Sequence, residues 1–70
     1  MTFSEKLVGL RRKAGLSQEE LASRLEVSRQ AVSKWETGAA DPSTANLLAL
    51  AKLYGVSPEE LLRSAQSEDA

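Results

Sequence analysis

The sequence predicts an all-α fold, a compact domain of five short helices. Two observations support this prediction: helix-capping residues recur along the chain, and between them the apolar residues follow helical spacing. No segment alternates polar and apolar residues as a strand does, and no repeat is present. Seventy residues make one domain at most, which we expect over residues 1–64, followed by a polar tail over 65–70 that frays.

The caps delimit the first two helices. A first helix is expected to start after Thr2, which lies three residues before Glu5 as in a capping box, and to stop at Gly15. Ser17 then caps a second helix over residues 18–25. The two helices are therefore expected to be joined by a short connection that contains a left-handed glycine.

Three further helices are expected in the rest of the chain. Ser28 caps a third helix, which Gly38 ends. Either Asp41 or Ser43 caps a fourth helix that runs to Tyr54 and is apolar around most of its circumference. A helix of that kind usually lies at the centre of a bundle. A short fifth helix follows after a glycine and a Ser-Pro pair.

Composition excludes several functional classes. The chain has no Cys and no His, so it lacks the ligands of most zinc sites and the usual general base near neutral pH. No apolar run approaches the roughly 20 residues that span a bilayer, and no signal-peptide pattern is present. We therefore expect a soluble cytoplasmic protein that is not an enzyme, with no metal, cofactor, membrane or small-molecule partner.

The charge distribution suggests where a polyanion would bind. The net charge is −1, but residues 1–40 carry seven basic and five acidic side chains, whereas residues 41–70 carry two and five. The more positive half contains the expected third helix. This weak asymmetry is consistent with a DNA-binding face at one end of the domain.

The expected third helix has two contrasting faces. At about 100° per residue, Ala31, Val32 and Trp35 fall on one side, which assigns Trp35 to a core rather than to base stacking. The other side has no carboxylate and carries Arg29, Gln30, Ser33, Lys34 and Thr37. These groups can read base edges and bind phosphates, although on an isolated helix they would indicate only a solvated face.

The second and third helices, joined by a short turn, have the arrangement of a helix-turn-helix motif. In that motif the first helix lies across the DNA backbone and the second enters the major groove. Gln18 opens the second helix of this chain, beside the positive end of the helix dipole, where a phosphate ligand is needed.

Several separated segments closely resemble the Cro/CI-type helix-turn-helix family, also called the XRE family. The matching segments are LSQEELA at 16–22, VSRQAVSKWETG at 27–38, PS at 42–43 and LAKLYGVS at 50–57. The resemblance extends over about residues 3–63. It implies a lambda-repressor-like DNA-binding domain of a sequence-specific transcriptional regulator, most simply a repressor.

The resemblance also implies roles for individual residues. Gln18 matches a glutamine that binds a phosphate, and Ser28 matches a cap that touches the DNA backbone. Arg11 and Glu36 match a structural ion pair that bridges the first and third helices. The positions that face bases are Arg29, Gln30, Ser33 and Lys34. Preferred pairings assign guanine to the basic side chains and adenine to the amide of Gln30.

The loop after the recognition helix departs from many relatives, which have basic residues there. This chain has Ala39-Ala40-Asp41 instead. We therefore expect the start of the fourth helix to replace some of these phosphate contacts through its backbone amides and Ser43, Thr44 or Asn46. Thr37, on the polar face of the third helix, is also expected to contact DNA.

Partners are expected to be double-stranded DNA and a second copy of the chain. A single recognition helix reads few base pairs, so a homodimer on a palindromic operator is expected. Leu53 and Leu62 either form the two-fold contact or close the domain's own core. The alternative function is a protein-interaction module of the same fold, an antitoxin or an adaptor.

Overall fold

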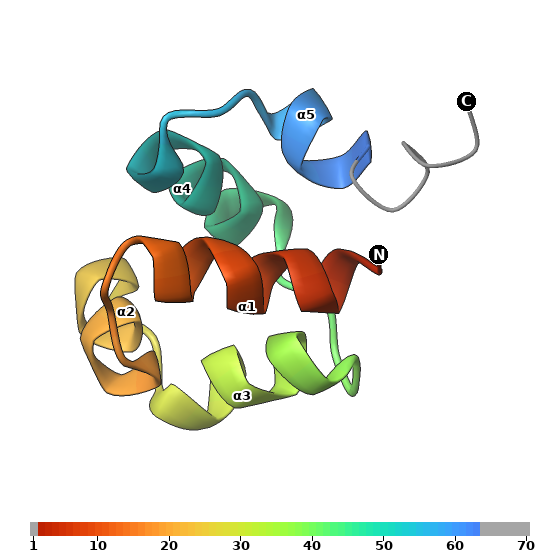
Figure 1. Ribbon diagram of the computed structural model, residues 1–70. Coiled ribbons are helices and arrows are strands. Elements are labelled where there is room, and N and C mark those ends of the chain that lie inside the picture. The colour runs from red at the N-terminus through yellow and green to blue at the C-terminus, as the bar shows by residue number, and fades with distance from the viewer. Residues whose placement is uncertain (1, 64–70) are drawn as a thin grey trace.

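The computed structural model describes residues 2–63, which fold into five helices around one core (Figure 1). The helices are α1 (Phe3–Lys13), α2 (Gln18–Leu25), α3 (Arg29–Thr37), α4 (Thr44–Tyr54) and α5 (Pro58–Arg63). The predicted all-α fold is confirmed. The tail over 65–70 lies outside the described residues, and its fraying stays a prediction. None of the five helices has the length and hydrophobicity needed to cross a lipid bilayer.

Side-chain caps fix where the helices begin. Ser17 Oγ accepts from Glu20 N at 3.0 Å, and Glu20 Oε1 accepts from Ser17 N at 2.8 Å, which completes a capping box. The hydrogen bond from Ser17 N favours the ionised carboxylate of Glu20, so the pKa of Glu20 lies below its ordinary value. Thr2 forms the same box at the start of α1. The open choice at α4 is decided by Ser43, whose hydroxyl accepts from Asn46 N at 3.2 Å.

The arrangement of the helices holds α3 firmly on one side of the domain. In Figure 1, α1 runs across the middle, with α3 below it and α4 and α5 above. Contacts between elements tie α3 to α1 and α2, and α4 to α2 and α5. The core consists of Leu7, Leu21, Ala22, Val32, Trp35, Leu50, Ala51 and Leu61. The described helices thus all contribute to one apolar cluster.

Three leucines in α4 and α5, at positions 48, 53 and 62, are buried to different extents. Leu53 is partly buried and packs against the core. Leu48 and Leu62 remain 51% and 52% exposed. Burial of Leu53 therefore favours the core-closing alternative for that residue, while Leu62 is left on the surface.

The turn between α2 and α3 contains a feature that the sequence did not predict. Glu26 adopts the left-handed conformation, with φ 59° and ψ 42°, and is the only described non-glycine residue with positive φ. Its backbone lets Val27 N donate to Ala22 O at 2.9 Å, which ends α2 sharply. An L-residue in this conformation costs about 1–2 kcal/mol because its Cβ approaches the following carbonyl.

We expect Glu26→Gly to stabilise the domain by about 0.5–1 kcal/mol, since glycine removes the Cβ strain at some cost in unfolded-chain entropy. Urea unfolding followed by the fluorescence of the single Trp would measure the change. Ser23→Gly, at an exposed position inside α2, is the control and should destabilise by about 1 kcal/mol. Equal losses in both variants would show that the turn is not strained.

Candidate nucleic-acid interface

Residues from α2 to α3 form a helix-turn-helix with three residues between the two helices. Ser28 ends the turn and caps α3, its Oγ accepting from Ala31 N at 3.1 Å. The two helices pack against each other, and α2 contributes Leu21 and Ala22 to the core. The first turn of α3 is therefore held at a fixed angle to α2.

The two faces of α3 differ as predicted. Val32 is fully buried and Trp35 is 5% exposed, so the tryptophan belongs to the core. On the opposite face Arg29, Gln30, Lys34 and Thr37 are exposed, and Ser33 is half-buried. Most of the polar side chains singled out on this helix therefore share one accessible surface.

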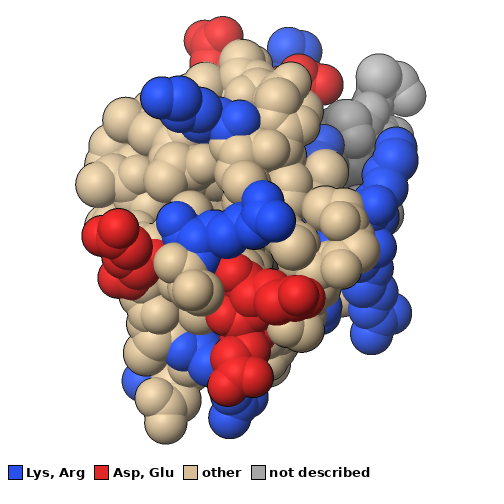
Figure 2. All heavy atoms as spheres, turned by 90° about the vertical axis from the view of Figure 1, so that its left-hand side faces the viewer, with Lys and Arg blue, Asp and Glu red and all other residues tan. Residues whose placement is uncertain are grey.

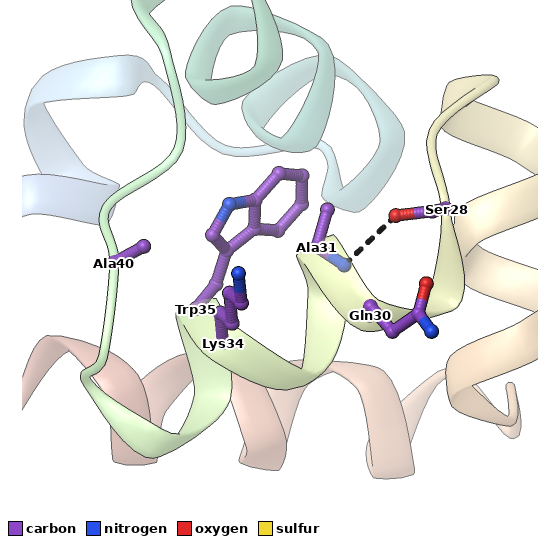
Figure 3. A pocket seen from close by; sticks show the side chains of 6 residues that line it. All are labelled: Ser28, Gln30, Ala31, Lys34, Trp35 and Ala40. Carbon is purple, nitrogen blue, oxygen red and sulfur yellow. Dashed lines mark hydrogen bonds between the residues drawn. The ribbon is translucent and has the colours of Figure 1, made fainter.

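A hollow of about 480 Å³ opens along one edge of this surface, where the polar face of α3 meets its apolar side (Figure 3). It is lined by Ser28, Gln30, Ala31, Lys34, Trp35 and Ala40. In this view the indole of Trp35 lies above Lys34, and Ala40 lines the side of the hollow away from α2. The hollow therefore combines an apolar floor with an amide and an ammonium at its mouth, a combination that suits the edge of a base.

The hydroxyl groups of Ser28, Ser43 and Thr37 differ in whether their hydrogen is free to donate to DNA. Those of Ser28 and Ser43 accept from backbone N–H groups, which leaves each hydroxyl hydrogen available to a phosphate. Thr37 instead donates its hydroxyl hydrogen to Lys34 O at 3.2 Å. In this rotamer Thr37 offers an acceptor only, so it cannot donate to a phosphate.

One carboxylate joins the first three helices. Arg11 Nε donates to Glu36 Oε2 at 2.8 Å, and Arg11 Nη2 donates to Glu36 Oε1 at 3.2 Å. The same Oε1 accepts from Gln18 Nε2 at 3.0 Å, and Arg11 Nη1 donates to Leu16 O at 2.9 Å. The structure thus contains the ion pair that the resemblance implies and adds Gln18 to it.

Burial makes the loss of one partner of this ion pair more costly than in a surface ion pair, because the remaining charge would be left buried and unpaired. The side chains of Arg11 and Glu36 are only 13% and 4% exposed. The hydrogen bond to Glu36 raises the pKa of Arg11. Gln18 uses one of its two amide hydrogens on Glu36, so the other is held in a fixed position from which it can bind a phosphate.

Charge on the side of α2 is mixed rather than uniformly basic. Figure 2 shows this side with α3 at the lower edge, and Lys and Arg alternate there with Asp and Glu. Binding of a polyanion at this end of the domain would therefore depend on particular donors more than on a broad positive field.

Two features of this region could not be predicted from the sequence. The contact of Gln18 with Glu36 spans 18 residues and depends on how α2 packs against α3. The hydroxyl of Tyr54, at the end of α4, is covered and has no hydrogen-bond partner among residues 2–63. Burial, reinforced by the charge of Glu36 and opposed by that of Arg11, raises the pKa of Tyr54 to about 12.

The chain was compared with protein-family models, with curated proteins and with solved structures. The helix-turn-helix family model matches residues 9–61. The chain belongs to this family. Its helix-turn-helix domain is 47% identical over 62 residues to the transcriptional activator BcrR of Enterococcus faecalis, covering 89% of this chain and 30% of BcrR. It is 44% identical to the uncharacterized HTH-type transcriptional regulator y4dJ of Sinorhizobium fredii, covering 81% and 80% of the two chains.

A solved structure shares both the fold and the sequence pattern of this helix-turn-helix domain. It is the P22 c2 repressor protein in complex with synthetic operator 9T, with a TM-score of 0.84 and 35% identity. The match covers 90% of this chain and 96% of that one. Five curated relatives are longer, and the chain spans between 30% and 61% of their length. The predicted resemblance to the Cro/CI type is confirmed.

We expect Glu36→Gln to lower the free energy of unfolding by about 2 kcal/mol, because Arg11 would keep its buried charge without a counter-charge. Urea unfolding monitored by Trp35 fluorescence would measure the loss. Glu19→Gln removes an exposed carboxylate from α2 and is the matched control, with an expected change within about 0.5 kcal/mol. Similar losses in the two variants would contradict a structural role for the pair.

The pKa of Tyr54 predicts how stability depends on pH. The unfolded chain releases the phenol proton near pH 10 and the folded chain near pH 12, so the folded form binds more protons between these values. Stability contributed by this group is therefore complete below about pH 10 and falls as the pH rises toward 12. Ultraviolet absorbance of the single tyrosine would give its pKa directly. A titration near pH 10 in the folded protein would contradict the burial of the hydroxyl.

Proposed function

We propose that this chain binds double-stranded DNA in a sequence-specific manner as part of a transcriptional regulator, most simply a repressor, with α3 in the major groove. The observation that carries the proposal is the exposed polar face of α3, which has no outward carboxylate. The likeness to a repressor that was solved with its operator supports it. We place the DNA-binding unit within residues 1–64.

Bases would be read from the exposed face of α3. Arg29 or Lys34 would donate to the acceptors of a guanine, and Gln30 would form the paired hydrogen bonds that suit adenine. Ser33 lies on the same face but is half-buried. Its short side chain would therefore contribute one hydroxyl to a base edge that lies close to the helix. Ala31 lies on the apolar side of α3 and packs against the core, but its methyl group also lines the hollow and would there contact the methyl group of a thymine.

Phosphates would be bound on either side of α3. Gln18 offers its second amide hydrogen at the start of α2, and Ser28 offers its hydroxyl at the start of α3. Ser43 and the first backbone amides of α4 would replace the basic loop residues that this chain lacks. Thr37 would join them only after its hydroxyl turns away from Lys34 O.

A homodimer on a palindromic operator follows from the small footprint of one recognition helix. The exposed side chain of Leu62 on α5 supports a two-fold contact there, while Leu53 is already packed against the core. Sedimentation of the free protein and of the DNA complex would test this assembly. A monomer at high concentration in both states would remove the dimer from the proposal.

Substitutions on α3 and α2 should separate base reading from phosphate binding. Arg29→Ala and Gln30→Ala should each relax specificity at one base pair and cost about 1–3 kcal/mol on the preferred site. Gln18→Ala should weaken binding to all sequences alike. Selection of bound duplexes followed by affinity measurements would show both effects.

Lys52→Ala is the control for these substitutions, because it removes an exposed cation from the last turn of α4 without touching α3. It should leave sequence preference unchanged. Uniform weakening by Arg29→Ala would contradict its base-reading role. Absence of DNA binding at low salt, with a protein co-purifying instead, would favour the antitoxin or adaptor alternative.

A further inference from the structure

Trp35 carries a hydrogen-bond donor that the hollow leaves accessible. Its side chain is 5% exposed and belongs to the core, yet it lines the hollow beside α3. Its indole N–H donates to no residue among 2–63. Among the buried and half-buried residues of that range, the Tyr54 hydroxyl is the only covered side-chain N or O atom without a partner, so the unpartnered indole nitrogen is not covered. A donor held by the core therefore reaches the hollow.

Figure 3 shows where this donor lies. The nitrogen is on the side of the indole nearer Ala40, and the six-membered ring is on the side nearer Ala31. The two ends of the hollow therefore differ. Gln30 and Ala31 line the end next to the turn between α2 and α3, and the indole N–H lies at the end that Lys34 and Ala40 line.

The chemistry of the second end fits a DNA phosphate better than the edge of a base. An indole N–H and a lysine ammonium are donors only, and the described lining of the hollow contains no carboxylate. A phosphate presents only acceptors, whereas most base edges mix donors and acceptors, as the amide of Gln30 does at the other end. Groups at the margin of a recognition helix meet the sugar–phosphate strand that borders the groove.

The loop after α3 leaves room for a phosphate at this end but offers it no cation. Residues 38–43 contain no lysine or arginine, and the small side chain of Ala40 is exposed. A hollow of about 480 Å³ is in the size range of pockets that hold whole small molecules. It can therefore accept a base edge at one end and a phosphate at the other. The indole N–H and Lys34 are the side-chain donors that such a phosphate would meet.

We propose that the indole N–H of Trp35 donates a hydrogen bond to one phosphate of the DNA strand that borders the major groove. The contact rests on the proposed function and adds a phosphate ligand to it. Packing in the core already holds the indole, so the bond requires little loss of side-chain freedom when DNA binds. The donor is uncharged, so it displaces no counter-ion. One residue thus packs the recognition helix and binds the DNA backbone.

Replacing Trp35 by benzothienylalanine tests the contact, because this analogue keeps the shape of the indole and has sulfur in place of the N–H. The chain has a single tryptophan, so incorporation in a tryptophan auxotroph changes this position alone. Affinity should fall by a similar factor, about threefold to tenfold, for a preferred duplex and for random duplexes, because a phosphate contact carries no sequence information. The slope of log affinity against log salt should stay unchanged.

Fluorotryptophan, incorporated in the same way, keeps the N–H and is the matched control, which should bind DNA as the parent does. Circular dichroism during urea unfolding checks that both proteins keep the stability of the parent. Equal losses of affinity in the two proteins, or none in the benzothienyl protein, would overturn the proposal. If the benzothienyl chain does not fold, the indole N–H proton resonance of the parent decides. It moves downfield on duplex binding if the N–H donates, and an unmoved resonance overturns the contact.

Duplexes with single methylphosphonates identify the acceptor, since this group removes the charge and one acceptor oxygen of one phosphate. At the contacted position it should remove most of the difference in affinity between the parent and the benzothienyl protein. A difference that depends on one base pair and survives every phosphate replacement would assign the N–H to a base and overturn the proposal. A parent that binds no duplex would overturn the proposed function as well. A parent that binds DNA equally well without the N–H overturns the contact alone.

Discussion

The carboxylate of Glu36 is the interaction on which the functional surface depends. It accepts hydrogen bonds from α1 through Arg11 and from α2 through Gln18, so three helices share one buried acceptor. Apolar contacts are non-directional and allow helices to slide by small amounts, whereas hydrogen bonds to a charged group fix both distance and angle. The orientation of α3 relative to α2 is therefore set by polar geometry on top of core packing.

The same pairing also keeps α3 compatible with a polyanion. Glu36 is the single acidic residue of the helix, and an outward carboxylate would repel phosphate groups. Its inward position, with Arg11 against it, hides the negative charge and leaves only neutral and positive groups outside. One residue thus orients the recognition helix and removes its own charge from the surface that would face DNA.

Local sequence rules predicted the helices better than the contacts between them. The caps at Thr2, Ser17, Ser28 and Ser43 act through neighbouring backbone groups, so spacing in the sequence was enough to find them. The left-handed Glu26 escaped prediction because glycine or asparagine usually marks such a position. The Gln18–Glu36 bond and the covered Tyr54 hydroxyl arise from packing between distant segments, which periodicity does not describe.

The division of α3 into two faces separates the residues that hold the fold from those that would, in the proposed function, determine sequence specificity. Val32 and Trp35 are buried in the core, and Glu36 anchors the polar network, so changes at these positions would disturb the fold itself. Arg29 and Gln30 are exposed, and neither belongs to the core cluster. Substitutions at the exposed positions therefore leave the scaffold intact while changing the groups that would face a base in the proposed complex. A domain built in this way can acquire a new target sequence without a new fold.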